Sequence, residues 1–509
     1  MPSVLTDDAR AAWVRLRATT WAMCALVFLA AFESLAVTTV MPTVSLELDG
    51  AALYAVAFAA PLASGVVGMV TAGAWADRAG PARPLLAAAI AFVVGLVVAG
   101  TAPTMVVLAG GRLLQGLGGG ALTVVSYVVV ARLYPGALHP RVFAGFSAAW
   151  VVPSLVGPPV AGFVTEHLDW RWVFLGVALI VPPIATVVLA RVRSLGPPEH
   201  PEPAPDGLTP AGRAADDAPT TVAGARRIAW AVLAAVAVLV LGVSGEIGGA
   251  ATVVVALVGV AVALGALSRL VPPGTLRAAR GLPAVIADRG LLAGAFFAAE
   301  VYLPYLLTRR YDVAATFAGV SLTAAALTWA SAAWVQGRLG ERLPHARAIQ
   351  VGTLIVTVGI AGTGVGAAAH APIPLLVVAW AVAGFGMGLT YARQTVLVLR
   401  YSTGRAAGTN SSALSVSDSI GASLALAVTG VLFAAASSRG GATPYVACFA
   451  LTAALAAGAA LLAARVTPRA AHGHAGASAN VAEDAPDDVR TDAAQRSSDT
   501  PTDSSVART

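Results

Sequence analysis

The chain has 509 residues, of which 57% are hydrophobic and only 11% are charged, against roughly 25% charged residues in soluble domains. Its formal net charge is +6, and all 32 basic residues are arginines. A chain this apolar cannot cover itself with a polar surface, and its arginines lie between apolar runs rather than in one patch. These features exclude a soluble protein and a nucleic-acid-binding protein, and they predict an integral membrane protein.

The apolar runs predict fourteen transmembrane helices, at roughly 20 residues per span. The first run has no small-residue cleavage site before Met41 and Pro42, so we expect it to be a retained helix rather than a signal peptide. The seventh and eighth runs are short and come as a pair, so the topology is the same whether or not both cross the membrane. The expected spans are 20–41, 53–76, 84–101, 105–131, 142–164, 172–191, 228–244, 250–267, 290–307, 314–335, 349–368, 373–394, 409–435 and 444–464.

The polar stretches between these runs predict the domain organisation. A proline-rich segment separates two halves, and the C-terminal tail is rich in Ser, Thr, Asp, Ala and Pro, which predicts disorder. We expect an all-α fold with two pseudo-symmetric six-helix bundles and an extra hairpin. The expected parts are a cytoplasmic N-terminus 1–19, an N-terminal bundle 20–191, a cytoplasmic linker 192–227, an inserted hairpin 228–267, a cytoplasmic loop 268–289, a C-terminal bundle 290–464 and a disordered cytoplasmic tail 465–509.

The distribution of arginines predicts the orientation. With the N-terminus inside, Arg112 lies within a helix, and the other arginines fall on the cytoplasmic side except for Arg171, Arg309, Arg310 and Arg439. This positive-inside bias predicts a multi-pass protein with cytoplasmic termini. The alanine-rich, arginine-only composition suggests a bacterium, and hence its plasma membrane.

A short charged turn occurs twice. Gly73, Asp77, Arg78, Gly80 and Arg83 lie between the second and third apolar runs. The glycine, the acid, the arginine and the closing arginine recur 264 residues later, where Glu341 corresponds to Asp77 and Arg342 corresponds to Arg78. Such an internal repeat indicates two related halves.

This turn resembles the G-x-L-x-D-R-x-G-R-K/R signature of the major facilitator superfamily. Residues 33–42 are similar to the helix-1 block of its fourteen-helix drug:proton antiporters, with Glu33 in place of the usual aspartate, and Arg112 to Gly116 resemble the helix-4 arginine motif. The fifth span resembles the exporter motif of helix 5 through Pro153, Gly157, Pro158 and Gly162. These blocks are dense in the N-terminal half, whereas only the repeat and the helix count cover the C-terminal half.

The resemblance implies alternating access, with the charged turns forming a cytoplasmic gate. Asp77 would interact with the N-terminus of the thirteenth span, where Thr409, Asn410 and Ser411 are candidate caps. Proline and glycine in the fifth span would bend it and allow close packing, which is consistent with a seal against proton leak.

Ionisable residues within the predicted spans are functional candidates because charge is costly there. We expect Glu33 and Arg112 to form the proton-coupling site, as the resemblance implies; a static ion pair is the alternative. Trp380 aligns with Arg112 in the second half, so the arginine function would not be duplicated. Residues expected to line the substrate cavity are Gln115, Glu300, Tyr302, Ser415 and Asp418.

The expected function is proton-coupled export of a small, amphipathic or cationic drug or metabolite. The alternatives are a proton-coupled importer of a polar nutrient on the same fold, and a membrane sensor or membrane enzyme, for which no catalytic constellation is found. Cys24 and Cys448 lie singly in apolar runs, and His472 and His474 lack further ligands, so we expect no metal site. The proton gradient replaces a cofactor, and we expect a monomer in the lipid bilayer that binds a small-molecule substrate and protons.

Overall fold

The computed structural model describes residues 7–193, 195, 221–339, 342–402 and 406–468. Contacts divide the chain into two units, Met1–Thr467 and Pro468–Thr509, and the fold below is that of the first. The tail from residue 469 onward, most of the linker and Glu341, about which the sequence makes predictions, lie outside the described residues, whereas Arg465, predicted as the start of the disordered tail, ends a short 3-10 helix (Ala463–Arg465).

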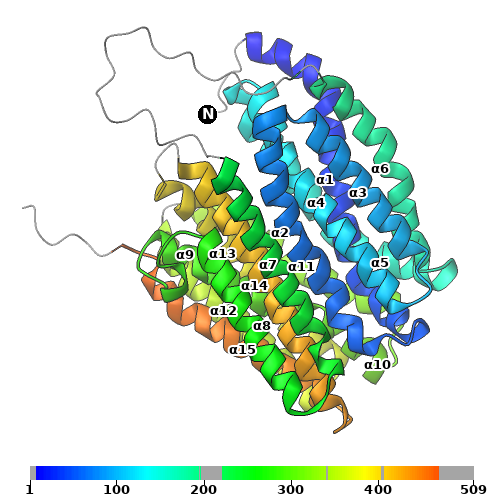
Figure 1. Ribbon diagram of the computed structural model, residues 1–509. Coiled ribbons are helices and arrows are strands. Elements are labelled where there is room, and N and C mark those ends of the chain that lie inside the picture. Colours follow the sequence, from blue (N-terminus) through cyan, green and yellow to red (C-terminus); the bar gives the residue numbers. More distant parts are fainter. Residues whose placement is uncertain (1–6, 194, 196–220, 340–341, 403–405, 469–509) are drawn as a thin grey trace, which may run out of the picture. The chain divides into compact units, whose positions relative to one another are not determined.

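Every regular element of the described residues is a helix (Figure 1). Fourteen of the described helical segments are long and apolar enough to cross a membrane, as the sequence predicts, and they include the pair that formed the expected hairpin. The α-helices are α1 (Asp7–Glu47), α2 (Tyr54–Ala79), α3 (Ala82–Gly100), α4 (Met105–Leu133), α5 (His139–His167), α6 (Arg171–Val192), α7 (Thr221–Val243), α8 (Gly249–Leu270), α9 (Leu282–Glu300), α10 (Tyr302–Arg310), α11 (Ala315–Leu339), α12 (His345–Ala368), α13 (Ile373–Arg400), α14 (Ala406–Ser437) and α15 (Thr443–Leu462).

One span is made of two helices. α9 ends at Glu300 and α10 begins at Tyr302, and together they form the span Leu282–Arg310. α9 begins after Gly281, which has a φ of +86°, and carries a proline in its first turn. The sequence predicts a cytoplasmic loop over 268–289, whereas in the structure Asp288 and Arg289 lie within helix α9.

Glycines set the helix packing in the same way in both halves. On α4, a Cβ at Gly116 or Gly120 would lie within 2.3 Å of backbone atoms of α2, and one at Gly118 would lie 2.3 Å from the Phe92 nitrogen of α3. On α13, Gly384 and Gly388 contact α11, and Gly386 contacts α12, equally closely. Small residues let transmembrane helices approach at the backbone. The two halves, which the sequence repeat predicts to be related, thus share one pattern of helix contacts.

The helix ends fall into two groups, which we name by one residue each. The Glu47 end carries the turns 47–54, 100–105, 167–171, 243–249, 310–315, 368–373 and 437–443, and the Asp77 end carries the turns 79–82, 133–139, 270–282, 339–345 and 400–406.

The two halves meet through α2 with α14 and through α5 with α11. α7 packs on both α2 and α14, so it joins helices of different halves. A Cβ at Gly242 would lie 2.9 Å from Val56 of α2, and one at Gly245 would lie 3.5 Å from Ala434 of α14. The inserted hairpin therefore covers the seam between α2 and α14.

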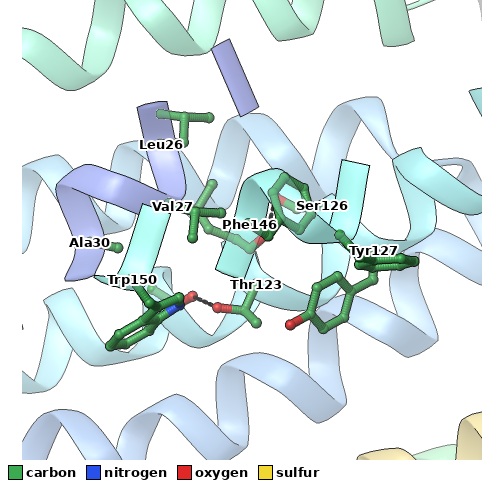
Figure 2. Close-up of a pocket in the computed structure, with 11 residues that line it drawn as sticks. Leu26, Val27, Ala30, Thr123, Ser126, Tyr127, Phe146 and Trp150 are labelled. Atoms are coloured by element: carbon green, nitrogen blue, oxygen red, sulfur yellow. Dashed lines mark hydrogen bonds between the residues drawn. The ribbon is translucent and has the colours of Figure 1, made fainter. Parts of the chain in front are cut away.

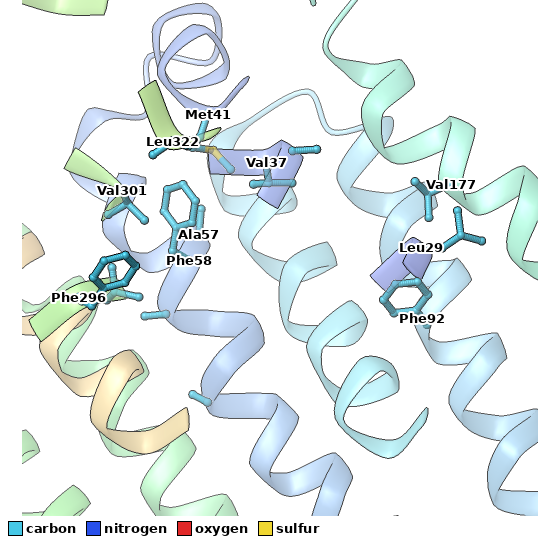
Figure 3. Packing of buried hydrophobic residues seen from close by; sticks show 14 of the residues in the cluster. Leu29, Val37, Met41, Ala57, Phe58, Phe92, Val177, Phe296, Val301 and Leu322 are labelled. Carbon is cyan, nitrogen blue, oxygen red and sulfur yellow. The ribbon is translucent and has the colours of Figure 1, made fainter. Parts of the chain in front are cut away.

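A continuous apolar core extends through the helices of both halves. Figure 3 shows Val37 and Met41 of α1 beside Phe58 of α2, close to Val301 and Leu322 from the other half. Phe296, Val37, Met41 and Val301 are all at most 4% exposed. Buried apolar side chains of both halves therefore fill the centre of the molecule on the side of the Glu47 end.

Candidate functional site

A buried ion cluster lies between α1, α2 and α4. Arg112 donates a hydrogen bond through Nη1 to Oε1 of Glu33, and Gln115 donates through Nε2 to Oε2 of the same carboxylate. Arg112 also donates to the Ala57 carbonyl of α2 at 3.1 Å and to Gln115 Oε1 at 2.6 Å. Glu33, Arg112 and Gln115 are each at most 3% exposed.

Helical geometry explains this cluster. Arg112 and Gln115 are three residues apart, so they lie on the same face of α4 and both reach α1. Both carboxylate oxygens of Glu33 are satisfied, and the arginine has a backbone carbonyl as an additional partner. A buried charge pair of this kind avoids the cost of an isolated charge. The structure brings together the two residues predicted for proton coupling and places Gln115 with them rather than in an open cavity.

A cavity of about 180 Å³ lies next to this cluster, between α1, α4 and α5. Figure 2 shows Thr123, Ser126 and Tyr127 of α4 together with Phe146 and Trp150 of α5 around it. Its walls are mostly apolar and aromatic. Tyr127 packs against Phe143 and Phe146 with ring centroids 5.6 and 6.1 Å apart. None of these lining residues is among those predicted from the sequence.

The cavity and the ion cluster are one helical turn apart on two helices. Ala30 lines the cavity and Glu33 follows it by three residues on α1, while Gly119 lines the cavity and Gln115 precedes it by four residues on α4. Residues three or four apart lie about 5–6 Å from one another on one helix face. A molecule in this cavity would therefore be within about one turn of the Glu33 carboxylate.

A second polar network lies in the C-terminal half. Arg289 donates to Asp418 Oδ1 at 2.6 Å, and its guanidinium carbon is 3.3 Å from the centre of the Tyr391 ring. Gln394 donates to Asp288 Oδ2 at 2.6 Å. Asp288 is fully buried, and its Oδ1 has no hydrogen-bond partner among the described residues. The predicted cavity residue Asp418 is thus an ion-pair partner.

Trp380 is buried and stacks on Phe296 with ring centroids 4.8 Å apart, so it does not replace Arg112 as a charge. The arginine of this half comes instead from α9. The residues that sequence reasoning missed, Asp288 and Arg289, could have been found from Gly281 and Pro283, since a proline at the first turn after a glycine is typical of a helix start.

The other predicted cavity residues occupy different places. Glu300 lies at the α9–α10 junction and makes no hydrogen bond or ion pair with any described residue. Ser415 is exposed and donates to the Ser411 carbonyl at 3.3 Å. Tyr302 is 1% exposed and stacks on Phe433 with centroids 5.3 Å apart. Tyr302 is therefore a packing residue at the Glu47 end.

Aromatic residues close the Glu47 end. Tyr54 of α2 stacks on Tyr305 of α10 with centroids 4.3 Å apart, and its hydroxyl donates to the Val301 carbonyl at 2.7 Å. Both contacts join the two halves. At the same end, on the seam between α5 and α11, the amide of Thr316 donates to Glu166 of α5 at 2.9 Å.

The predicted helix-5 motif lies on the seam between α5 and α11. A Cβ at Gly162 would be 2.4 Å from the Thr316 Cα, and one at Gly319 would be 2.7 Å from the Pro158 carbonyl oxygen. Gly157 faces Phe32 of α1, and Pro153 is one turn away within α5. The motif glycine Gly162 thus permits backbone contact between the halves.

The charged turn at the Asp77 end does not join the two halves through any hydrogen bond or ion pair among the described residues. Gly80 has a φ of +75° and ends α2, while Asp77, Arg78 and Arg83 are exposed. Asp77 makes no hydrogen bond or ion pair within the part of the chain that the structure describes; the charges that act on it are those of Arg132 and Arg78. Gly73 faces Val124 of α4, and Arg342 is exposed. The expected contact of Asp77 with the start of α14 is not formed in this state.

A comparison with family models matches residues 23–357 to the Major Facilitator Superfamily. The chain belongs to this superfamily. Members of this superfamily are multi-pass secondary transporters that are typically non-enzymatic and bind small-molecule substrates in the membrane.

Several curated superfamily transporters are similar to the chain. It is 33% identical over 239 residues to an uncharacterized MFS-type transporter of Mycobacterium tuberculosis, which covers 47% of the chain and 32% of the relative. It is 30% identical over 172 residues to a probable multidrug-efflux transporter of the same species, covering 34% and 35%. The chain thus spans about a third of the length of the curated relatives it matches.

Solved structures of the superfamily show the same fold. A POT family transporter in complex with 5-aminolevulinic acid superposes with a TM-score of 0.63 at 13% identity, over 88% of this chain and 97% of that one. The xylose transporter XylE from E. coli gives a TM-score of 0.57 at 13% identity, over 89% and 98%. At this identity the likeness concerns the fold alone.

Proposed function

We propose that this transporter is a proton-coupled antiporter that exports a small, amphipathic or cationic drug or metabolite by alternating access, as do the fourteen-helix drug:proton antiporters that it resembles. The observation that carries the proposal is the buried Glu33–Arg112–Gln115 cluster, one helical turn from an aromatic cavity. The similarity to a probable multidrug-efflux transporter supports export.

The proposed site couples protons through one carboxylate. In its charged form Glu33 holds Arg112 and Gln115 together, which ties α1 to α4. A proton on Glu33 would remove the charge pair and release the arginine, so the two protonation states favour different packing of these helices. The cavity residues, Glu300 and Asp418 would attract and hold the substrate.

The proposed orientation places both termini and the Asp77 end in the cytoplasm of a bacterium, following the excess of arginines at that end. The Glu47 end, closed by Tyr54 and Tyr305, would then face outward, and the structure would be an inward-facing state. Asp77 and Arg78 would form a cytoplasmic gate with α14 in the outward-facing state, and helix 5 would seal the seam. In this arrangement inward proton flow drives outward substrate flow.

The test uses inverted membrane vesicles with a preset acidic interior and a panel of lipophilic cations. We expect at least one cation to collapse the gradient through the wild type. Glu33→Gln should abolish this response, because the amide cannot bind and release a proton. Glu47→Gln is the matched control, since it makes the same change on the same helix, where the side chain is 46% exposed.

A response that persists in Glu33→Gln would overturn coupling through Glu33 and move it to Glu300 or Asp418. A lack of response to every cation would refute the cationic export proposal and direct the search to neutral or anionic metabolites. Gradient collapse only when the compound is placed inside the vesicles would indicate a symporter. A melting curve for each variant shows whether it is folded.

A further inference from the structure

A second, larger cavity lies beside α8 of the inserted hairpin. It has a volume of about 490 Å³ and runs between α8 and the C-terminal helices α9, α14 and α15. Leu264 and Leu267 line it from α8, Leu424 from α14, and Leu455 from α15. Volumes of roughly 300–1,000 Å³ are typical of ligand sites.

The floor of this cavity is formed by α9 and α14, whose backbones touch each other. A Cβ at Gly421 of α14 would lie 2.1 Å from the Gly290 carbonyl oxygen of α9, and a Cβ at Gly294 would lie 2.8 Å from the Gly421 carbonyl oxygen. With no side chains on these glycines, an apolar slot remains above them. On α15 the lining extends from Leu451 to Leu462, which corresponds to about 16 Å along the helix.

Two arginines lie at one end of the slot. Arg277 and Arg465 both line it and are exposed. Arg465 donates to the Arg277 carbonyl at 3.5 Å, and its own carbonyl accepts from the Gly281 amide at 3.0 Å, so the two segments are held together. Neither guanidinium forms an ion pair with a described residue, and no Asp or Glu lines the cavity among the described residues. The charge at this end is therefore uncompensated.

The slot faces the surroundings of the helices rather than the transport cavity. Of the most apolar stretch of α8, only 22% is buried, and Leu264 and Leu276, which line the slot, are 36% and 49% exposed. In a membrane-spanning protein the neighbour of such a face is lipid. The two arginines lie at the Asp77 end of the helices, near the level of a headgroup, and basic pockets between transmembrane helices bind anionic headgroups.

We propose that this crevice binds one anionic phospholipid. Its acyl chain lies along the glycine floor between α8 and α15, and its phosphate accepts hydrogen bonds from Arg277 and Arg465. Arginine suits this role because its planar guanidinium binds phosphate oxygens in pairs. The inserted hairpin supplies one wall, so the site exists only because the hairpin packs beside the C-terminal half.

The test is native mass spectrometry of the full chain released from detergent, with phosphatidylglycerol and phosphatidylcholine of identical acyl chains added at equal concentrations. We expect one tightly bound phosphatidylglycerol, retained about 30-fold more strongly than phosphatidylcholine, because the choline cation cancels the net negative charge that each arginine attracts by about 1 kcal/mol. Arg277→Gln with Arg465→Gln should remove this preference, and Arg277→Lys with Arg465→Lys should keep most of it. Arg309→Gln with Arg439→Gln, at the Glu47 end, is the matched control and should leave the preference unchanged.

Leu264→Trp tests the slot itself. The larger side chain would fill the space above the glycines, so binding of phosphatidylglycerol should fall while the arginines remain. Equal retention of both lipids by the wild type would overturn the proposal, as would an unchanged preference after Arg277→Gln with Arg465→Gln. Binding of inorganic phosphate that displaces the lipid, with no effect of Leu264→Trp, would show a headgroup site without an acyl slot and would also overturn it.

Discussion

The glycines of α4 give a test of the helix packing that positions the ion cluster. A Cβ at Gly120 would lie 2.1 Å from the Gly65 carbonyl oxygen of α2, whereas contacts under 3.0 Å essentially never occur. Gly120→Ala must therefore push α2 and α4 apart. A Cβ at Gly110, on the same helix, would have no neighbouring atom of the described residues within 4 Å, so Gly110→Ala meets no obstacle.

The two substitutions are chemically identical, and their difference isolates the close contact. Alanine in place of glycine stabilises a helix by about 0.5–1 kcal/mol, and this gain applies to both variants. Overpacking costs about 1–3 kcal/mol, and it applies to Gly120→Ala alone. We expect Gly110→Ala to melt above the wild type and Gly120→Ala below it, with Gly110→Ala more stable by about 1–3 kcal/mol.

The assay follows thiol labelling of Cys448, which is fully buried in the native state, during heating of variants in a Cys24→Ser background, because Cys24 is partly exposed. Gly388→Ala in α13 repeats the test in the other half, since its Cβ would lie 2.3 Å from the Trp329 carbonyl oxygen. Equal melting points for Gly120→Ala and Gly110→Ala would show that α2 and α4 are not in backbone contact. The reasoning about the repeated glycines would then be wrong.

Two further predictions concern the ion cluster and the closed end. Glu33→Leu and Arg112→Met should each destabilise the protein by about 3–5 kcal/mol, because each leaves one buried charge unpaired, while the double variant should recover most of this loss. Melting curves of the two single variants and of the double variant measure these changes. Single variants as stable as the wild type would contradict the prediction. Tyr54→Phe removes the hydrogen bond to the Val301 carbonyl, worth about 0.5–1.5 kcal/mol, and should raise the open population of the Glu47 end roughly 2- to 10-fold. Spin labels at the exposed Leu46 and Phe317, in a variant without cysteines, measure this as a longer distance across that end, and an unchanged distance distribution would refute it.

The pairing of Glu33 with Arg112 could be predicted from the sequence because a charge within an apolar span needs a partner, and few are present. The position of Gln115 also follows from its spacing to Arg112. In contrast, hydropathy assigns Asp288 and Arg289 to a loop because the two charges precede the apolar run. Hydropathy alone cannot show that a helix begins before its apolar stretch, whereas the glycine and proline at 281–283 can.

Tyr302 and Asp77 illustrate two other limits. Tyr302 follows Glu300 by two residues, and residues two apart do not share a helix face; Tyr302 stacks on Phe433, a contact that a pattern of apolar residues does not reveal. The contact predicted for Asp77 belongs to one of two conformations of a transporter. A sequence encodes both conformations, but it does not indicate which one a given structure adopts.

The position of α7 has a consequence for molecules dissolved in the bilayer. Two lateral seams separate the halves of this fold, one between α2 and α14 and the other between α5 and α11. α7 packs along the first of them, so a lipophilic compound moving sideways from the lipid meets a helix there instead of an opening. Sideways entry would therefore require opening of the α5–α11 seam, whose helix α5 also forms the aromatic wall of the cavity. The added helices α7 and α8 thus leave one of the two seams between the six-helix bundles uncovered toward the membrane, the seam between α5 and α11.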